Sequence, residues 1–227
     1  MAVLVITIDG PAASGKSTVA RLLAKKLGAS FLDTGAMYRA VTFAAIQEGV
    51  DLKNEESLLV IIEKNDFRFS AKNDLMTVNI NGIDVTEQLR DPEVTANARY
   101  IAAAPKVREK LVQMQRQYAA QQERIVTEGR DQGTVAFPDA NAKFFLVAQP
   151  RERAKRRLAE LKAKGINESL EKIQELIEKR DKTDSERDVG PLKPAQDAIK
   201  IDTTDLNIDQ VLDKILEFVM RSNSLSD

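Results

Sequence analysis

The chain has 227 residues, no cysteine, no histidine and a formal net charge of −1, from 34 lysines and arginines against 35 aspartates and glutamates. A chain of this length buries roughly 70 to 75 per cent of its unfolded surface, enough for one α/β domain with an insertion and without a disulfide or metal staple. The balanced charge argues against a nucleic-acid partner, and the absence of histidine removes the commonest general base and metal ligand.

The sequence shows no secretory pattern at its N-terminus and no apolar run near the roughly 20 residues that span a bilayer. Together with the absence of cysteine, this predicts a cytoplasmic protein without a membrane partner. We also expect a monomer.

A glycine-rich motif follows the first apolar run of the chain. The segment Val3–Asp9 is apolar and β-branched, which is typical of a strand buried on both faces of a parallel sheet. Residues 10–17 match G-x-x-x-x-G-K-[ST] in full, and apolar residues then recur at helical spacing until Gly28. Strand, loop and helix in this order indicate a phosphate-binding loop.

In such a loop the backbone N–H groups and the helix N-terminus hold the β-phosphate. Lys16 would reach the β- and γ-phosphate oxygens, and the Ser17 hydroxyl would ligate Mg²⁺. The residues expected to bind ATP are Gly10, Pro11, Ala12, Ala13, Ser14, Gly15, Lys16, Ser17 and Thr18.

A short strand over Ser30–Leu32 leads into Asp33-Thr34-Gly35, and a helix is predicted over 36–47. Asp-Thr-Gly is also the active-site triplet of aspartic proteases, but that chemistry needs two such carboxylates, and nothing in the chain resembles a second D-[ST]-G. Two interpretations stay open: Asp33 or Thr34 caps the helix, or the segment contacts a substrate.

The pattern changes to alternation from Asp66 to Val85, with a tight Asn-Gly turn at 81–82. This predicts a small antiparallel hairpin set inserted into the main domain. Two helices are predicted next, over 92–102 and 106–120, separated at Pro105. Arg108 lies beside the apolar stripe of the second helix, where it is either solvated or at the edge of a cleft.

The predicted strand Arg124–Thr127 ends in a charged loop between glycines. In a phosphate-loop protein such a strand often ends in an acid that helps hold the Mg²⁺ water shell, which makes Glu128 the candidate. Arg130 and Asp131 follow at the carboxyl end of the strand, where open α/β sheets bind ligands.

After a further strand over 143–147, residues 150–165 carry seven basic side chains against two acidic ones. On a helix Arg153, Arg156 and Arg157 share one face. Such a face is either simply solvated or belongs to a closing lid that neutralises a transferring phosphoryl group.

A helix from about Glu168 shows an apolar stripe formed by Leu170, Ile173, Leu176 and Ile177. Continuing the stripe predicts that Arg180 and Asp184 lean inward, with Arg187 one turn on. These charges form either a structural salt bridge or a substrate clamp. A last strand over 198–202 and a helix over 209–220 complete five strand-helix alternations, which predict a parallel sheet covered on both faces.

Several segments together resemble bacterial cytidylate kinases, from about Val5 to the last helix. They are residues 8–17, 33–39 (Asp-Thr-Gly-Ala-Met-Tyr-Arg), 105–108 (Pro-Lys-Val-Arg), 129–134 (Gly-Arg-Asp-Gln-Gly-Thr), 152–157 (Glu-Arg-Ala-Lys-Arg-Arg), and 180–187 followed by Pro191-Leu192.

The resemblance implies a three-layer α/β P-loop fold with about five central parallel strands, a small antiparallel β insertion and a helical lid. It implies one kinase domain over 1–227. The core would take 1–35, 86–149 and 190–227, the monophosphate-binding region 36–105 with its insert at 66–85, and the lid about 150–188.

The resemblance also implies a reaction, in which the γ-phosphoryl group of ATP moves to CMP or dCMP with Mg²⁺ as cofactor. Arg39, Arg130 and Arg187 would hold the acceptor phosphate, Arg180 and Asp184 the ribose, and Arg108 and Asp131 the cytosine, with Thr34 nearby. The implied catalytic residues are Lys16, Arg130, Asp131 and the lid arginines Arg153, Arg156 and Arg157. Mg²⁺ would be held by Ser17 and, through water, by Glu128.

The chain departs from the family pattern at two positions. Glu128 stands where the family commonly has aspartate, and Arg99 stands where many members have a serine that contacts the base. Arg99 is therefore not assigned to the site.

Three other functions follow from the residues alone: a phosphate-loop kinase for another small acceptor such as UMP or an alcohol, a GTP-dependent switch protein, and a structural α/β domain. Switch proteins read guanine with [NT]-K-x-D, and no such tetrapeptide occurs in the sequence.

Overall fold

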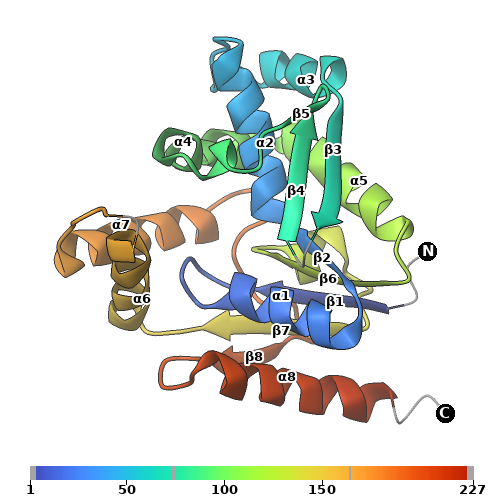
Figure 1. The fold of residues 1–227 in the computed structure, drawn as a ribbon, viewed down its shortest axis with the longest axis vertical. Coiled ribbons are helices and arrows are strands. Elements are labelled where there is room, and N and C mark those ends of the chain that lie inside the picture. Colours follow the sequence, from blue (N-terminus) through green and yellow to red (C-terminus); the bar gives the residue numbers. More distant parts are fainter. Residues whose placement is uncertain (1–3, 73–74, 164, 224–227) are drawn as a thin grey trace.

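The structure is a computed structural model, and it describes residues 4–72, 75–163 and 165–223. Its centre is a parallel sheet that confirms the predicted α/β fold (Figure 1). The strand predicted over Val3–Asp9 is observed from Leu4, and Val3 lies outside the described residues. In spatial order the strands are β2 (Ser30–Asp33), β6 (Arg124–Gly129), β1 (Leu4–Asp9), β7 (Ala142–Val147) and β8 (Ile199–Asp202).

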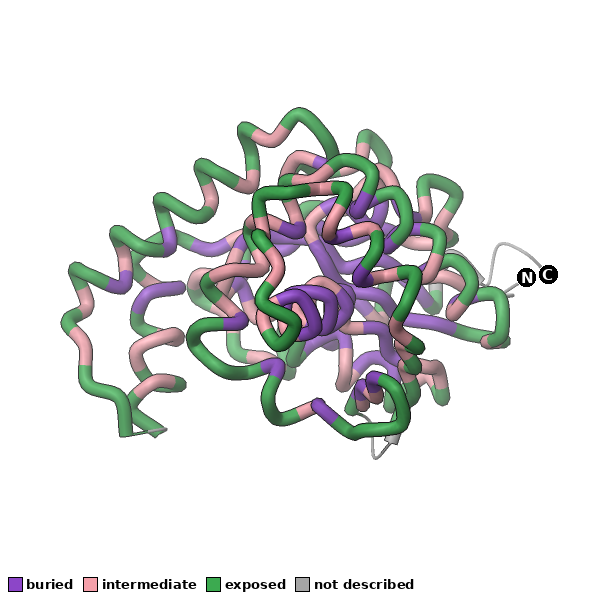
Figure 2. Tube along the Cα trace, turned by 90° about the horizontal axis from the view of Figure 1, so that it is seen from above, coloured by how far each residue is buried: buried purple, intermediate pink, exposed green. Residues whose placement is uncertain are grey.

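Helices cover both faces of the sheet because successive strand residues point to opposite sides. Val126 packs into a core shared with α1 (Lys16–Leu27) and α8 (Ile208–Asn223). Its neighbour Ile125 packs into a second core, shared with α2 (Thr34–Gln47) and α5 (Pro105–Ala120). Buried positions gather around these two cores in the middle of the molecule (Figure 2).

The predicted antiparallel insertion is also observed. It consists of β3 (Phe67–Lys72), β4 (Leu75–Ile80) and β5 (Ile83–Asp84), paired in that order. Asn81 and Gly82 both have positive φ, 53° and 86°, as the two central residues of a type I′ hairpin turn require. A 3₁₀ turn (Gln88–Arg90) and α4 (Pro92–Ala103) lead from the insertion to α5.

Helix α3 (Glu55–Lys64) was not predicted from the sequence. The Asn54 side chain accepts a hydrogen bond from the Ser57 N–H at 3.1 Å and so caps the helix. Only Leu58 and Ile61 of this helix are buried. A stripe of two buried residues is too short to show helical periodicity in the sequence. The capping residue Asn54 was therefore the only clear sequence signal for this helix.

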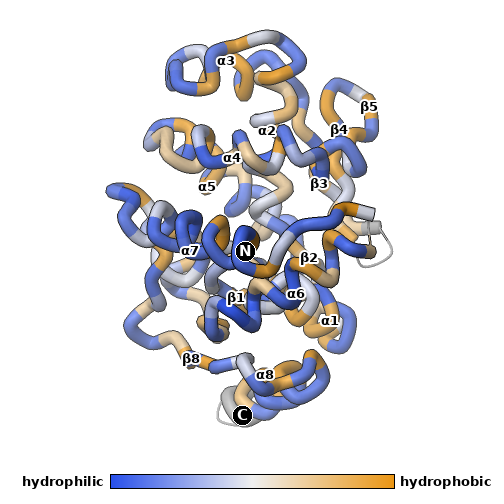
Figure 3. The backbone as a smooth tube through the Cα atoms, turned by 90° about the vertical axis from the view of Figure 1, so that its left-hand side faces the viewer, coloured by the Kyte–Doolittle hydropathy of each residue, from blue (hydrophilic) through white to orange (hydrophobic). Residues whose placement is uncertain are grey.

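Helices α6 (Pro150–Ala163) and α7 (Leu170–Ser185) form a hairpin beside the sheet (Figure 1). They share a small core centred on Ala154, Ile173 and Ile177, and most of their other positions are exposed or half-buried (Figure 2). Helix α7 is mainly hydrophilic (Figure 3). Within the described part of the chain, no helix is long and apolar enough to cross a membrane.

Candidate functional site

The loops that carry the predicted site residues leave the central sheet at one edge. Parallel pairing places Asp9 beside Gly129, and Asp33 beside Glu128. The loops after β1, β2 and β6 therefore begin next to one another, at the edge where open α/β sheets bind ligands. These three loops therefore gather at one edge of the sheet, as predicted.

The predicted phosphate-binding loop runs from β1 into α1. Gly15 caps α1 with φ of 89°, a left-handed conformation that glycine adopts without a steric penalty. A Cβ atom at Gly10 would overlap the carbonyl oxygen of Leu146 in β7. A side chain is therefore excluded at Gly10 and would be strained at Gly15. The residues expected to bind ATP, from Gly10 to Thr18, form one continuous loop and first helical turn.

Lys16 is buried, with 6% of its surface exposed, and its ammonium curls back over this loop. The Nζ atom donates to the Pro11 carbonyl at 3.1 Å and lies 3.9 Å from the Glu128 carboxylate. Burial, and then the charge of Arg130, lower the pKa of Lys16 to about 8. Among the described side chains, the buried Ser14 hydroxyl has no hydrogen-bond partner. A buried ammonium and an unpartnered hydroxyl in the same loop fit an anionic ligand.

Ser17 and Glu128 bring together two oxygen atoms of the type that Mg²⁺ prefers. Ser17 Oγ donates to Glu128 Oε1 at 2.7 Å, and burial raises the pKa of the Glu128 carboxyl. The described residues contain no group of three or more acidic side chains that could hold a metal ion. Mg²⁺ usually takes one or two protein oxygens, several waters and substrate phosphates, so this hydroxyl and carboxylate fit it.

The three arginines predicted to hold the acceptor phosphate are paired with carboxylates. Arg39 donates to Asp33 at 3.0 Å and Arg130 donates to Asp184 at 2.8 Å, while Arg187 lies 3.8 Å from the same Asp184. Burial opposes ionisation of Asp184, but Arg130 and then Arg187 outweigh it and lower the pKa of Asp184. The structure thus brings Arg130 and Arg187 to one carboxylate, and Asp33 orients Arg39.

Arg108 and Asp131 form a buried ion pair deep in the same region. Arg108 also donates to the Ala102 carbonyl at 3.1 Å and lies over the ring of Tyr38, 5.4 Å from its centre. A side chain at Gly190 would overlap both charged groups of the pair. Of the two interpretations for Arg108, the solvated one is wrong, because the side chain is buried.

Thr34 joins the start of helix α2 to the end of strand β6. Its buried hydroxyl donates to the Glu128 carbonyl at 2.7 Å. Helix α2 starts at Thr34 instead of the predicted Ala36, and the Asp33 side chain caps it by accepting from the Ala36 N–H at 2.9 Å. The capping interpretation of this segment is therefore confirmed for Asp33.

The apolar stripe of α7 differs from the predicted one at Leu176, which is 58% exposed. Ile173 and Ile177 form the buried stripe, and Asp184 continues it with a side chain that is only 14% exposed. Arg180 was expected to lean inward because it lies one step after Leu176, but that prediction is wrong, since Arg180 is exposed.

The three predicted lid arginines lie at i, i+3 and i+4 in helix α6 and so share one face of it, but their side chains do not share one environment. Arg153 is buried and donates to the carbonyls of Ala148 and Ala12 at 2.9 and 3.2 Å. Arg156 donates to the Thr203 carbonyl at 2.6 Å. The Arg157 side chain is 41% exposed and pairs with Glu160 within its own helix. Arg153 and Arg156 therefore tie α6 to neighbouring loops in this conformation.

Two acidic residues at the site were not among the predicted site residues. Asp181 lies 2.5 Å from Arg153 and joins α7 to α6, and Asp33 orients Arg39 in addition to capping α2. Asp181 is four residues after Ile177, so a stripe drawn through Ile173 and Ile177 would have found it.

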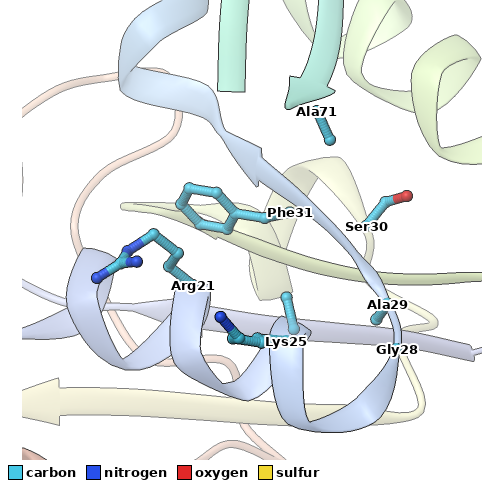
Figure 4. A pocket seen from close by; sticks show the side chains of 8 residues that line it. Arg21, Lys25, Gly28, Ala29, Ser30, Phe31 and Ala71 are labelled. Carbon is cyan, nitrogen blue, oxygen red and sulfur yellow. The ribbon is translucent and has the colours of Figure 1, made fainter. Parts of the chain in front are cut away.

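One pocket lies beside these residues, and another lies apart from them. One of about 160 Å³ lies between the junction of α4 and α5 and the end of α7, where Arg187 lines it. The larger one, about 290 Å³, lies between the C-terminal half of α1, β2 and Ala71, where Arg21, Lys25 and Phe31 line it (Figure 4). It contains none of the predicted site residues.

Comparison with solved structures shows the fold. The chain is similar to a gluconokinase from Sinorhizobium meliloti, with a TM-score of 0.52 and 15% identity over 99% of this chain and 96% of that one. It is also similar to the protein TT1252 from Thermus thermophilus, with a TM-score of 0.51 and 17% identity over 97% and 98% of the two chains.

Comparison of sequences identifies the family, whereas comparison of structures identified only the fold. The chain is 51% identical to a cytidylate kinase from Stutzerimonas stutzeri over 95% of this chain and 94% of that protein. It is 46% identical to a cytidylate kinase from Bacillus anthracis over 95% of both proteins. The family model described as cytidylate kinase matches residues 6–221. The chain therefore belongs to the cytidylate kinase family.

Proposed function

We propose that this protein transfers the γ-phosphoryl group of ATP to the phosphate of CMP or dCMP, giving ADP and CDP or dCDP. The observation that carries the proposal is the group of Arg39, Arg130 and Arg187 beside the phosphate-binding loop, next to the buried Arg108–Asp131 pair. The names of the relatives at 46 to 51% identity support the same activity.

A phosphate acceptor explains how a kinase works without histidine. A phosphate monoester has a second pKa of about 6, so its attacking oxygen is already mostly ionised at pH 7 and needs no strong general base. The remaining task is to bring two anions into line. Lys16 and the arginines would do this by positioning the phosphates and neutralising their charge.

The carboxylates of Asp33 and Asp184 would orient these arginines until the acceptor binds. Arg39, Arg130 and Arg187 would then share their donors with the oxygens of the CMP phosphate, while Asp184 and the solvent-open Arg180 contact the ribose. Guanidinium forms charged hydrogen bonds to phosphate as it does to carboxylate, so each arginine would keep a charged bond when it exchanges partners.

Arg108 and Asp131 would read the cytosine. A buried pair that must bond to a base edge rejects bases that leave either member unpaired. The small pocket beside Arg187 lies on this side of the site.

ATP would bind at Gly10 to Thr18, and Mg²⁺, held by Ser17 and through water by Glu128, supplies charge neutralisation at the phosphates when bound. We also propose the division into a core, a monophosphate-binding region over 36–105 and a lid over 150–188. Arg157, the most exposed of the three lid arginines, is the best placed to reach the phosphoryl group on closure, and Arg153 and Arg156 would hold the hinge of the lid. A cytoplasmic monomer is the simplest setting for the reaction.

The proposal is tested by coupled ADP release with ATP and a panel of acceptors: CMP, dCMP, UMP, AMP and GMP. We expect CMP and dCMP to give the highest kcat/KM, and AMP and GMP to give turnover close to background. A preference for AMP or GMP would refute the assignment to cytidylate, and a preference for UMP would assign the base contacts to another pyrimidine.

Gly190 offers a test of the base-reading pair that alters no charge. Because a Cβ atom there would overlap Arg108 and Asp131, Gly190→Ala is expected to displace the pair and raise the KM for CMP about tenfold, since misplacement by 1 Å can cost about a hundredfold in rate. Gly49→Ala is the matched control. Both glycines have similar positive φ, 59° and 66°, but nothing lies within 4 Å of the added Cβ at Gly49. Steady-state kinetics with CMP should separate the two variants, and equal KM values would argue against the placement of the base.

A further inference from the structure

Asp9 is a buried carboxylate, 4% exposed, that the proposed reaction does not use. It is the last residue of β1 and directly precedes Gly10 of the phosphate-binding loop. Its Oδ1 accepts from the Gln132 N–H at 2.9 Å, and its Oδ2 accepts from the Gly133 N–H at 2.8 Å. Asp9 therefore spans from the ATP-binding loop to the segment that follows Arg130 and Asp131.

The two N–H groups belong to a single turn of π-helix over Gln132–Ala136. Single π-helical turns are rare in proteins, and those that occur are often found at functional sites. Asp131 immediately precedes this turn, and the N–H groups of Val135 and Ala136 both bond to the Asp131 carbonyl, at 2.8 and 3.3 Å. The position of the turn thus determines where the Asp131 backbone lies.

Other contacts hold the turn from different sides. The Thr127 hydroxyl donates to the Gln132 side chain at 2.8 Å. From α5, Arg116 donates to the carbonyls of Val135 and Ala136, both at 2.8 Å. The Asp9 carboxylate is the contact that comes from the ATP-binding side.

A carboxylate suits this position because two neighbouring backbone donors need two acceptor atoms. An amide of the same size offers one acceptor and places an NH₂ group against the second N–H. Burial raises the pKa of Asp9 to about 7, and the hydrogen bonds from Gly133 and Gln132 oppose this rise because they favour the ionised carboxylate. Burying such a group is costly unless it is well bonded.

We propose that Asp9 is a positioning residue that sets the Arg130–Asp131 segment relative to the phosphate-binding loop, and so aligns the acceptor with the donor. The inference rests on the proposed function. Strand pairing already aligns Asp9 with Gly129, but it ends there, and the two side-chain bonds extend the alignment to the residues that follow Asp131.

The test is Asp9→Asn, assayed beside the wild-type protein. We expect the KM for CMP to rise and kcat to fall, with kcat/KM for CMP reduced by about tenfold to a hundredfold. The dissociation constant of a fluorescent ATP analogue, measured without acceptor, should change less than about twofold, because the backbone N–H groups of the phosphate-binding loop do not bond to Asp9. Asp51→Asn is the matched control: Asp51 is exposed and also accepts a backbone N–H, from Lys53 at 3.0 Å.

If Asp9→Asn lowers the melting temperature but keeps a wild-type KM for CMP and a wild-type kcat per folded molecule, the proposal is overturned, because the Asp9 carboxylate then serves stability alone. If Asp9→Asn does not fold, amide hydrogen exchange of the wild-type protein decides. The N–H groups of Gln132 and Gly133 should exchange as slowly as those of β6 in the absence of nucleotide, and rapid exchange would overturn the inference. A wild-type protein inactive on CMP would refute the proposed function instead.

Discussion

Replacing Lys16 by alanine is expected to lower kcat at least about a hundredfold, the size of effect seen when one preorganised charge-stabilising donor is removed. Lys16 is the buried cation of the phosphate-binding loop, and no described lysine occupies an equivalent position in that loop. Its loss would also leave Glu128, 3.9 Å away, without its nearest ammonium. The measurement is single-turnover transfer from ATP to CMP, which separates chemistry from product release.

Lys26→Ala is the control for this prediction, because Lys26 lies on the same helix and is exposed. It should retain wild-type turnover. Near-normal turnover in Lys16→Ala would remove Lys16 from the catalytic residues and would leave the phosphate-binding loop as a binding element only.

The second large effect is expected from Asp131→Asn. Asp131 is buried and paired with Arg108, so the substitution leaves a buried guanidinium without its counter-charge. Removing one partner of a buried pair costs about 3 to 5 kcal/mol of stability, and we expect the free energy of unfolding to fall by at least the lower figure. The kcat/KM for CMP should fall at least about a hundredfold, since the base then meets an incomplete set of partners.

Glu56→Gln is the control for the pair. Glu56 forms an ion pair with Lys106 at 2.6 Å, but both side chains are more than half exposed, and exposed pairs contribute about 0 to 1 kcal/mol. Denaturant unfolding and CMP kinetics should therefore show little change. If Asp131→Asn keeps the wild-type ratio of kcat/KM for CMP over UMP, the pair does not read the base.

The parts of the site that are contiguous in the chain could be predicted from the sequence. The phosphate-binding loop is one, because strand, glycine loop and helix follow one another and each has a clear local signal. The position of Glu128, Arg130 and Asp131 at the sheet edge is another, since it follows from the rule that ligands bind at the carboxyl ends of parallel strands.

The parts that depend on tertiary packing could not be predicted. Helical spacing placed Arg153, Arg156 and Arg157 on one face, but spacing does not say which carbonyls lie within reach of each guanidinium. The π-helical turn after Asp131 has no sequence pattern of its own, and it is held by side chains from distant elements, Asp9 and Arg116. The contacts of Asp9 could therefore be found only in the structure.

The most direct test of the central claim is to follow the transferred group itself. The protein is incubated with CMP and with ATP labelled in its γ-phosphate, and the products are separated. We predict that the label is recovered in the β-phosphate of CDP, in equal amount to the ADP formed. Label recovered as inorganic phosphate, with CMP unchanged, would contradict the account.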